Sequence, residues 1–304
     1  MKAFIRAISS ISLQASFRSD NVYAELKPIS ADSDVVAPDY KEFIEATSLR
    51  RLSPILRMGL TASKECQAAI QTPFDSISVG TALGCLKDTE KFLVTFNTTT
   101  SDFLSPTAFI QSTHNTIGGQ ISLGLGNHAY NMTHTQNSLS FEVAMVDGLL
   151  CIEEGKKNVL VGAAEEKIPF LKHLQPTLIS DDYPLSSGAT FFALSPEKDE
   201  NSIEIRGVYT NFNSKNITTE IEEFLRTEGL SLNELALILS NELLPLPEEI
   251  AQINYLEFTG LHYSASSFAV HIGHDYLRAR TKGFVLVVNT LCKGKLGLTL
   301  LERT

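Results

Sequence analysis

The hydrophobic residues of the chain follow two patterns: short apolar runs, and longer stretches in which apolar and polar residues mix. The runs at 76–84, 158–166 and 235–241 are rich in apolar and small residues. They are too short for typical helices and predict strands buried on both faces. The longer stretches at 54–70 and 264–281 predict helices. Because such strands and helices alternate in both halves of the chain, the sequence predicts an α/β fold.

Further apolar stretches extend this pattern. Residues 127–134 predict a strand that leads into a helix at 139–152. Apolar residues surround that helix rather than forming one stripe, which predicts that it is buried on all sides. Residues 189–195 and 202–212 predict two strands paired with each other, and residues 284–302 predict a closing hairpin around a Lys-Gly-Lys turn.

Three short polar residues stand where helices are expected to begin. Ser53 precedes Pro54, and serine before a proline in the first helical position is a frequent helix start. Asp88 is expected to cap a helix at 88–96. Ser138 precedes the buried helix, and its simplest role is likewise to cap that helix through its hydroxyl.

Composition narrows the class of protein. A hydrophobic content of 43% with 20% charged residues is typical of a globular chain. The net charge of −10 argues against nonspecific nucleic-acid binding, which needs an excess of lysine and arginine. No apolar stretch reaches the ~20 residues of a membrane span, and Arg6 interrupts the apolar N-terminus. We therefore expect no membrane span and a cytoplasmic location.

The four cysteines are scattered, with no Cys-x-x-Cys pair and no histidine at the spacing of a metal site. They are expected to be reduced, mostly buried thiols, and neither a metal nor a cofactor is expected. These residues are Cys66, Cys85, Cys151 and Cys292.

From Pro106 to Glu166 the order of features is similar to that of the ketosynthases of the thiolase family. A helix containing Gln120 and a turn at Gly126 lead to the strand at 127–134, and the buried helix ends at Gly155, before the run GAAEE. The resemblance implies a thiolase-like αβαβα layered fold. It would consist of two related halves, residues 1–172 and 173–304, with the C-terminal half shortened.

The resemblance also assigns the family's catalytic slots. Ser138 occupies the slot of the nucleophilic cysteine, by counts from Gln120 forward and from Gly155 backward. The segment with Gly260 matches the family's Lys-x-x-x-Gly-His run, which places Leu256 in the lysine slot and Leu261 in the histidine slot. The family's other histidine is expected between residues 174 and 261, where this chain has none. No catalytic residue is therefore expected.

A residual polar site is the alternative. Ser138 could act as a nucleophile if a base lay beside it. His262 stands one residue beyond the histidine slot, and His134 is close to Ser138 in sequence. Gln136 resembles the glutamine that decarboxylating variants carry in the cysteine slot, although it stands two residues early.

A thiolase-family protein without these groups resembles the chain-length factor of a type II polyketide synthase. The segments YKEFIEATSLRRLSPILRMG and SLSFEVAMVDG of this chain are most similar to small ketosynthase-like proteins of aryl-polyene and flexirubin-type pathways. The resemblance implies a subunit that is not an enzyme by itself. It would pair with an active ketosynthase, shape the acyl-chain tunnel and meet an acyl carrier protein through the complex.

Two other functions stay open. One is an active acyltransferase or decarboxylase that uses Ser138 or a nearby histidine. The other is a self-paired protein that binds an acyl chain or a carrier. In the family's fold the strand before the nucleophile pairs with its counterpart in the second subunit, so Ala129, Tyr130 and Met132 are expected in a dimer interface.

Overall fold

The computed structural model describes residues 2–99, 106–178, 183–199 and 202–303. The strands of the N-terminal half are β1 (Phe4–Ile11), β2 (Ser76–Gly80), β3 (Tyr130–His134), β4 (Val159–Glu165) and β5 (Gly188–Ser195). Those of the C-terminal half are β6 (Ile203–Asn211), β7 (Leu235–Ser240), β8 (Gln252–Asn254), β9 (Gly283–Asn289) and β10 (Leu296–Arg303).

The helices that carry the argument below are α3 (Pro54–Ile70), α4 (Leu86–Thr98), α5 (Pro106–Gln111), α6 (Thr116–Leu125), α7 (Ser140–Glu153), α9 (Ile217–Thr227) and α11 (Ala265–Arg278). Shorter helices are α1 (Val22–Glu25), α2 (Ala46–Leu49), α8 (Leu171–Leu178) and α10 (Leu256–Thr259), with 3-10 turns at η1 (Tyr40–Glu42), η2 (Asn137–Leu139) and η3 (Leu232–Glu234). No helix among the described residues is both long and apolar enough to cross a membrane.

The strand order repeats. It runs β3-β2-β4-β5-β1 in the first half and continues as β6-β10-β9-β7-β8 in the second. Each half therefore has the same order, third-second-fourth-fifth-first, and the first strands of the two halves meet in the middle. They join through only two residue pairs, Phe4 with Glu204 and Ile5 with Ile203. β2 is parallel to β3 and β4, and β7 is parallel to β8 and β9, as the buried apolar runs predict.

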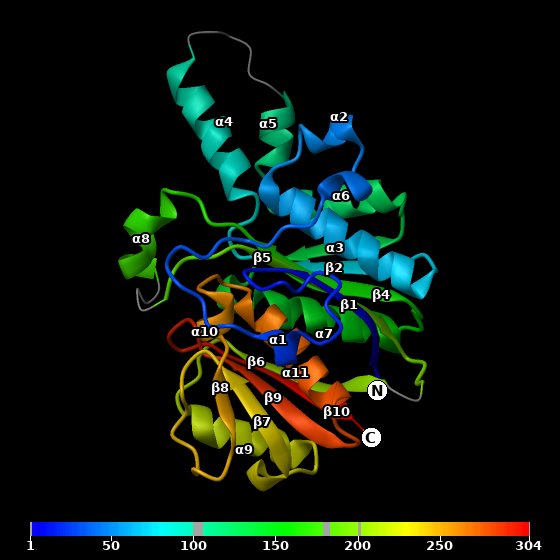
Figure 1. The fold of residues 1–304 in the computed structure, drawn as a ribbon, viewed down its shortest axis with the longest axis vertical. Helices are drawn as coiled ribbons and strands as arrows, with labels where there is room; N and C mark the ends of the chain where they lie inside the picture. The colour runs from blue at the N-terminus through cyan, green and yellow to red at the C-terminus, as the bar shows by residue number, and fades with distance from the viewer. Residues whose placement is uncertain (1, 100–105, 179–182, 200–201, 304) are drawn as a thin grey trace.

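Five layers follow from this duplication (Figure 1). Helices α7 and α11, which occupy equivalent places in the two halves, form a central layer between the sheets, and α3 and α9 cover the outer faces. Three apolar cores separate the layers. The chain thus has the thiolase-like ketosynthase fold that the resemblance implies, with helices on both faces of each sheet.

The C-terminal half is shortened at one connection. Residues 81–129 join β2 to β3 and contain α4, α5 and α6, whereas the equivalent residues 241–251 join β7 to β8 without a helix. The equivalence of the strands also places β5 with the first half. We therefore propose that the halves divide between β5 and β6, later than the boundary expected at residue 172.

Two local expectations were wrong, and a third was confirmed in position only. β5 and β6 are not paired with each other, because β1 lies between them. Asp88 does not cap α4: Cys85 is the N-cap residue, and Asp88 lies buried in the first turn. Ser53 is the N-cap residue of α3, with Pro54 in the first turn, as expected, although the Ser53 hydroxyl makes no capping hydrogen bond.

Candidate functional site

The strand-to-helix turn between β3 and α7 is a strained elbow. Asn137 has a φ of 61°, in the left-handed region that few residues other than glycine adopt. Its side-chain oxygen accepts the backbone N–H of Ser138 at 2.8 Å, which holds the turn in place. A strained turn between a strand and a buried helix is the geometry that exposes a nucleophile in several enzyme folds. Here the strained residue carries an amide.

Ser138 does not cap α7, contrary to expectation. The N-cap residue is Leu139, and the hydroxyl at the turn that makes hydrogen bonds belongs to Ser140. Ser140 Oγ accepts the N–H of Gln136 at 2.9 Å and donates to the carbonyl of Asn137 at 2.6 Å. The Ser138 hydroxyl is fully buried without a hydrogen-bond partner. Since no base contacts it, Ser138 is poorly placed to act as a nucleophile.

A buried asparagine ties this elbow to the C-terminal half. Asn289, at the end of β9, donates to the carbonyl of Ser138 at 2.7 Å and to Glu142 Oε1 at 2.9 Å. Its amide also lies 3.4 Å from the hydroxyl of Ser266 on α11. Burial raises the pKa of Glu142, although hydrogen bonds from Asn289 and Ser266 oppose the effect. The elbow is thus held by groups that lie about 150 positions away and that no local pattern identified.

A thiol also reaches the elbow. Cys292 Sγ donates to Asn137 Oδ1 at 3.1 Å, from the loop between β9 and β10. The side chain of Cys292 is half-buried, while the other three cysteines are buried. The sequence alone gave no reason to place this thiol beside the elbow.

His134 belongs to a different cluster. Its Nε2 lies 3.1 Å from Asp147 Oδ2 on α7, and the hydroxyl of Tyr130 donates to the other oxygen of Asp147 at 2.9 Å. Burial raises the pKa of Asp147, but hydrogen bonds from His134, Ser78 and Tyr130 outweigh it, and the net shift is downward. His134 therefore stabilises the packing of β3 on α7.

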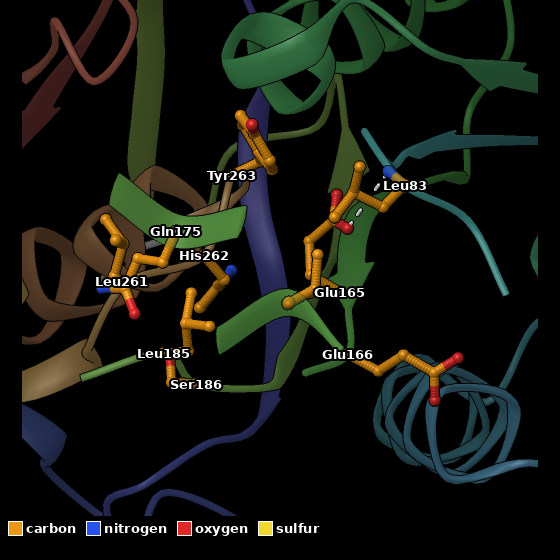
Figure 2. A pocket seen from close by; sticks show the side chains of 10 residues that line it. Leu83, Glu165, Glu166, Gln175, Leu185, Ser186, Leu261, His262 and Tyr263 are labelled. Atoms are coloured by element: carbon orange, nitrogen blue, oxygen red, sulfur yellow. Dashed lines mark hydrogen bonds between the residues drawn. The ribbon is translucent and has the colours of Figure 1, made fainter. Parts of the chain in front are cut away.

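His262 lines a small pocket on the other side of the site (Figure 2). Glu165, Leu261 and Tyr263 line it too. The pocket holds about 30 Å³, which admits water rather than an acyl chain. Burial raises the pKa of Tyr263 to about 12, and the charges of Cys292 and Glu165 add to that effect.

Burial favours the neutral forms of the histidine and the two glutamates that line this pocket. Burial lowers the pKa of His262 to about 4 and leaves its Nδ1 without a partner. Burial raises the pKa of Glu165 and of Glu166 to about 7, against backbone and side-chain hydrogen bonds that favour their charged forms. A histidine that stays neutral to such low pH is a poor general acid at neutrality.

The carboxyl groups of Glu165 and Glu166 both accept hydrogen bonds from neighbouring elements of the fold. Glu165 accepts hydrogen bonds from the N–H of Ala82, from the hydroxyl of Ser264 at 3.1 Å and from the N–H of Leu83 at 3.3 Å. It thereby joins the β2–α4 turn to the start of α11. Glu166 accepts the N–H of Lys87 at 2.9 Å, in the first turn of α4. Figure 2 shows Glu166 pointing away from Glu165.

Leu256 and Leu261, which the resemblance assigns to the lysine and histidine slots, are buried apolar residues. Leu256 is 3% exposed and Leu261 is 1% exposed, and both belong to the central core. Gly260 has a φ of +67°, and a Cβ there would lie 2.8 Å from Ser186 and 2.9 Å from the carbonyl of Pro184. Only glycine fits this close approach without a shift of its neighbours.

The residual polar site that the sequence suggested is therefore not assembled. Within the described residues, no hydrogen bond or ion pair joins the side chains of His134, Gln136, Ser138 and His262 to one another. Nor does any group of three or more histidine, cysteine, aspartate or glutamate side chains in that part of the chain suit a metal ion.

The residues expected at a dimer interface are exposed. β3 is an edge strand, and in it Tyr130 is 40% and Met132 is 42% exposed. Ala129, just before the strand, is exposed as well. That these residues contact a second subunit stays a prediction.

A model of a known protein family matches the first half of the chain. The family model "Beta-ketoacyl synthase, N-terminal domain" matches residues 25–188, which is more than half of the chain. No curated protein matches the chain in sequence.

Solved structures are similar over the whole length. A structure of the ishigamide ketosynthase/chain length factor shares 15% identity at a TM-score of 0.83, over 99% of each chain. A type II polyketide synthase acyl-carrier protein in complex with its ketosynthase gives 15% identity and a TM-score of 0.78, over 100% of this chain and 99% of the other. A ketosynthase in complex with its chain length factor from Xenorhabdus doucetiae gives 15% and 0.64, over all of both chains. Identities this low show a shared fold.

Proposed function

The chain belongs to the beta-ketoacyl synthase family, and from that premise we propose that it is a chain-length-factor-like subunit without catalysis of its own. In this proposal it pairs with an active ketosynthase and shapes the tunnel that receives the growing acyl chain. The substrates would be acyl chains on an acyl carrier protein, in a type II polyketide or aryl-polyene pathway. The location would be cytoplasmic.

One observation carries the proposal: neither Asn137 nor Ser138, the residues of the elbow that precede the buried helix, is a cysteine, and the Ser138 hydroxyl has no hydrogen-bond partner. A condensing enzyme of this kind needs a thiolate at the start of the buried helix and groups that stabilise the enolate. Here the strained residue is Asn137, and Ser138 follows it with its hydroxyl buried and unpartnered. Whichever of the two stands in the cysteine slot, neither carries a thiol. The slots in the second half hold Leu256 and Leu261.

The edge of the sheet supports a partner subunit. β3 offers an unpaired strand edge flanked by exposed apolar side chains, and such an edge favours pairing with another chain. Helices α4 and α5 project from the same half (Figure 1) and expose Phe96, Phe109 and Ile110 to about 60% each. Exposed apolar side chains that gather in this way favour contact with another protein.

The proposal also matches what the similar structures are said to contain. Two of them are ketosynthases with chain length factors, and the third includes an acyl-carrier protein. For this chain a heterodimer with a cysteine-bearing ketosynthase, and a carrier bound through that pair, are proposals. A homodimer through β3 is the main competitor, because the same strand edge would serve it.

Co-expression with the ketosynthase of the same pathway tests the proposal. We expect a one-to-one heterodimer by light scattering, and condensation of acyl and malonyl groups on a carrier by the pair only, read by intact-protein mass spectrometry. The matched control is the same pair with the partner's nucleophilic cysteine replaced by alanine, which should be inactive. Condensation by that control, or a stable acyl adduct on this chain alone, would show that the chain is itself an enzyme.

A further inference from the structure

The edge strand β3 and helix α7 share a buried pair of ionisable side chains. His134 Nε2 lies 3.1 Å from Asp147 Oδ2, and neither atom is exposed or has another partner among the described residues. The other carboxylate oxygen of Asp147 accepts the hydroxyl of Tyr130 at 2.9 Å. The carboxylate is therefore enclosed by protein groups at the edge where a second subunit is proposed to bind.

Few other charged side chains face this pair. On α7, Cys151 and Glu154 lie one and two turns further along the helix, and both act on Tyr130. Burial raises the pKa of Tyr130 to about 12 and also raises the pKa of Cys151, so both keep their protons near neutral pH. Glu154 is exposed and Lys156, which acts on Cys151, is half-exposed, so water screens both charges.

The remaining neighbours of the pair carry no charge. β2 contributes the hydroxyl of Ser78, and neither α6 nor the turn η2 contains a charged residue. The charge buried at this edge is therefore that of the His134–Asp147 pair itself.

Pairing through β3 would remove the remaining water from this pair. The side chains of His134 and Asp147 are each 16% exposed, and Tyr130 is 40% exposed. Tyr130 and His134 stand at alternate positions of β3 and so share one face of the strand. A strand added to the edge places its own side chains beside them. Covered in this way, the pair pays more for any net charge.

The number of protons on the pair decides that net charge. A carboxylate beside a neutral imidazole carries −1. One added proton gives either a carboxylate beside an imidazolium or a carboxyl group beside a neutral imidazole, and both of these states are neutral overall. Because burial disfavours a net charge, a covered pair favours the additional proton, whichever of the two groups takes it.

Resting on the pairing proposed above, we propose that association through β3 takes up one proton at the His134–Asp147 pair, so that the complex strengthens as pH falls. By linkage, uptake of one proton changes the dissociation constant by up to about tenfold per pH unit. A heterodimer contains this pair once and a homodimer twice, so the limit for a homodimer is about 100-fold. The dependence falls between about pH 6 and pH 8, where imidazole groups change charge.

The first test measures the dissociation constant of this chain and the ketosynthase of its pathway at pH 6, 7 and 8. We expect pairing to weaken about three- to tenfold per pH unit. Asp147→Asn should remove most of that dependence, because its side chain is neutral without a proton and still accepts from Tyr130. The matched control, Asp32→Asn at an exposed turn, should keep the dependence of the parent chain. An equal dependence in the parent and in Asp147→Asn would overturn the proposal, since the proton then binds elsewhere.

A second variant guards against misfolding of the first. Asp147→Ala combined with Tyr130→Phe removes the carboxylate together with the hydroxyl that it accepts, and should likewise lose the pH dependence.

Calorimetry counts the protons directly. Titrating this chain into the ketosynthase at pH 7.5, in buffers that differ in ionisation enthalpy, should show net uptake that both Asp147 variants lack. No uptake, or the same uptake in the parent and the variants, would refute the proposal while leaving the proposed function intact. If the chain pairs only with itself, the heterodimer fails, and the same measurement on the homodimer should find up to two protons. A chain that pairs with neither would overturn both.

Discussion

The thiol of Cys292 donates a hydrogen bond to the side-chain oxygen of Asn137, 3.1 Å away, across 155 positions of sequence. The elbow of a ketosynthase needs a thiolate at the start of the buried helix, and here the nearest described thiol comes from a loop of the other half. Its partner is an amide, which cannot take its proton. The pair therefore looks suited to holding the loop against the elbow rather than to forming an acyl-enzyme.

Cys292 should be the first cysteine to react with iodoacetamide in the folded chain. It is half-buried, whereas Cys66, Cys85 and Cys151 are buried and burial raises the pKa of each of those thiols. Alkylation depends on exposed thiolate. Peptide mass spectrometry should find one fast-reacting site, which Cys292→Ser abolishes. Fast labelling of a buried cysteine instead would mean that the folded core opens readily.

Ser138→Ala should change the free energy of unfolding by less than ~1 kcal/mol, because no hydrogen bond is lost with the hydroxyl. The hydroxyl has no hydrogen-bond partner and is fully buried, so removing it leaves no other group unsatisfied. Ser140→Ala is the comparison, because Ser140 Oγ makes two hydrogen bonds at the turn and its loss should cost ~1–2 kcal/mol. Denaturant unfolding measures both. A larger cost for Ser138→Ala than for Ser140→Ala would contradict this assignment of roles.

Much of the fold could be predicted from the sequence because it depends on local pattern. The buried runs became β2, β4 and β7, and the helix at 139–152 became α7 in the central layer. Burial of that helix on all sides was not confirmed, because Leu150 is 50% exposed. Pairing was harder. The strands β5 and β6 are adjacent in sequence but separated by β1, because each half closes its sheet with its first strand.

The site depended on contacts that local pattern does not encode. Asn289 and Cys292 reach the elbow from the far end of the chain. One local signal was present: an asparagine before the buried helix, since asparagine tolerates positive φ better than most residues. It would have marked Asn137 as the strained position. The caps expected from Asp88 and Ser138 failed for a similar reason, because serine and aspartate near a helix start do not reveal which hydroxyl or carboxylate turns toward the backbone.

The stability of Glu165→Gln should rise relative to that of the parent chain as pH rises. The pKa of Glu165 is about 7 in the folded chain against an ordinary 4.5, so folding favours its neutral form. The stability that this shift contributes is present in full below pH 4.5 and is lost as pH rises through 7. The upper bound is about 3 kcal/mol for a shift of this size. We expect the variant's deficit, caused by weaker acceptance from Ala82 and Leu83, to shrink or reverse between pH 5 and pH 8.

Chemical denaturation across that range measures the effect, with the exposed Glu222→Gln on α9 as the control for loss of charge. A difference between Glu165→Gln and the parent chain that stays constant from pH 5 to pH 8 would rule out a buried, protonated Glu165.

His262→Leu should show the opposite dependence. The pKa of His262 falls from an ordinary 6.5 to about 4 on folding, so the folded chain favours the neutral ring. That contribution is present in full above pH 6.5 and is lost as pH falls through 4. Relative to the parent chain, the variant should therefore gain up to about 3 kcal/mol between pH 7 and pH 4. Histidine-specific NMR should place the midpoint of the His262 titration well below 6; a midpoint near 6.5 would show that the ring is hydrated.

Met132→Lys should prevent pairing while leaving the chain folded. The side chain is 42% exposed on the edge strand β3, so a lysine there can reach solvent in the isolated chain. In a continuous sheet across two subunits the same lysine would be buried without a counter-charge, at a cost of several kcal/mol. We expect at least a 100-fold weaker complex with the ketosynthase, measured by light scattering and by dilution of the co-expressed pair.

Leu243→Lys is the matched control: its side chain is 72% exposed beyond β7, at the opposite end of the sheet, and its substitution should leave pairing intact. Equal loss in both variants would indicate general aggregation, and normal pairing by Met132→Lys would move the interface away from β3.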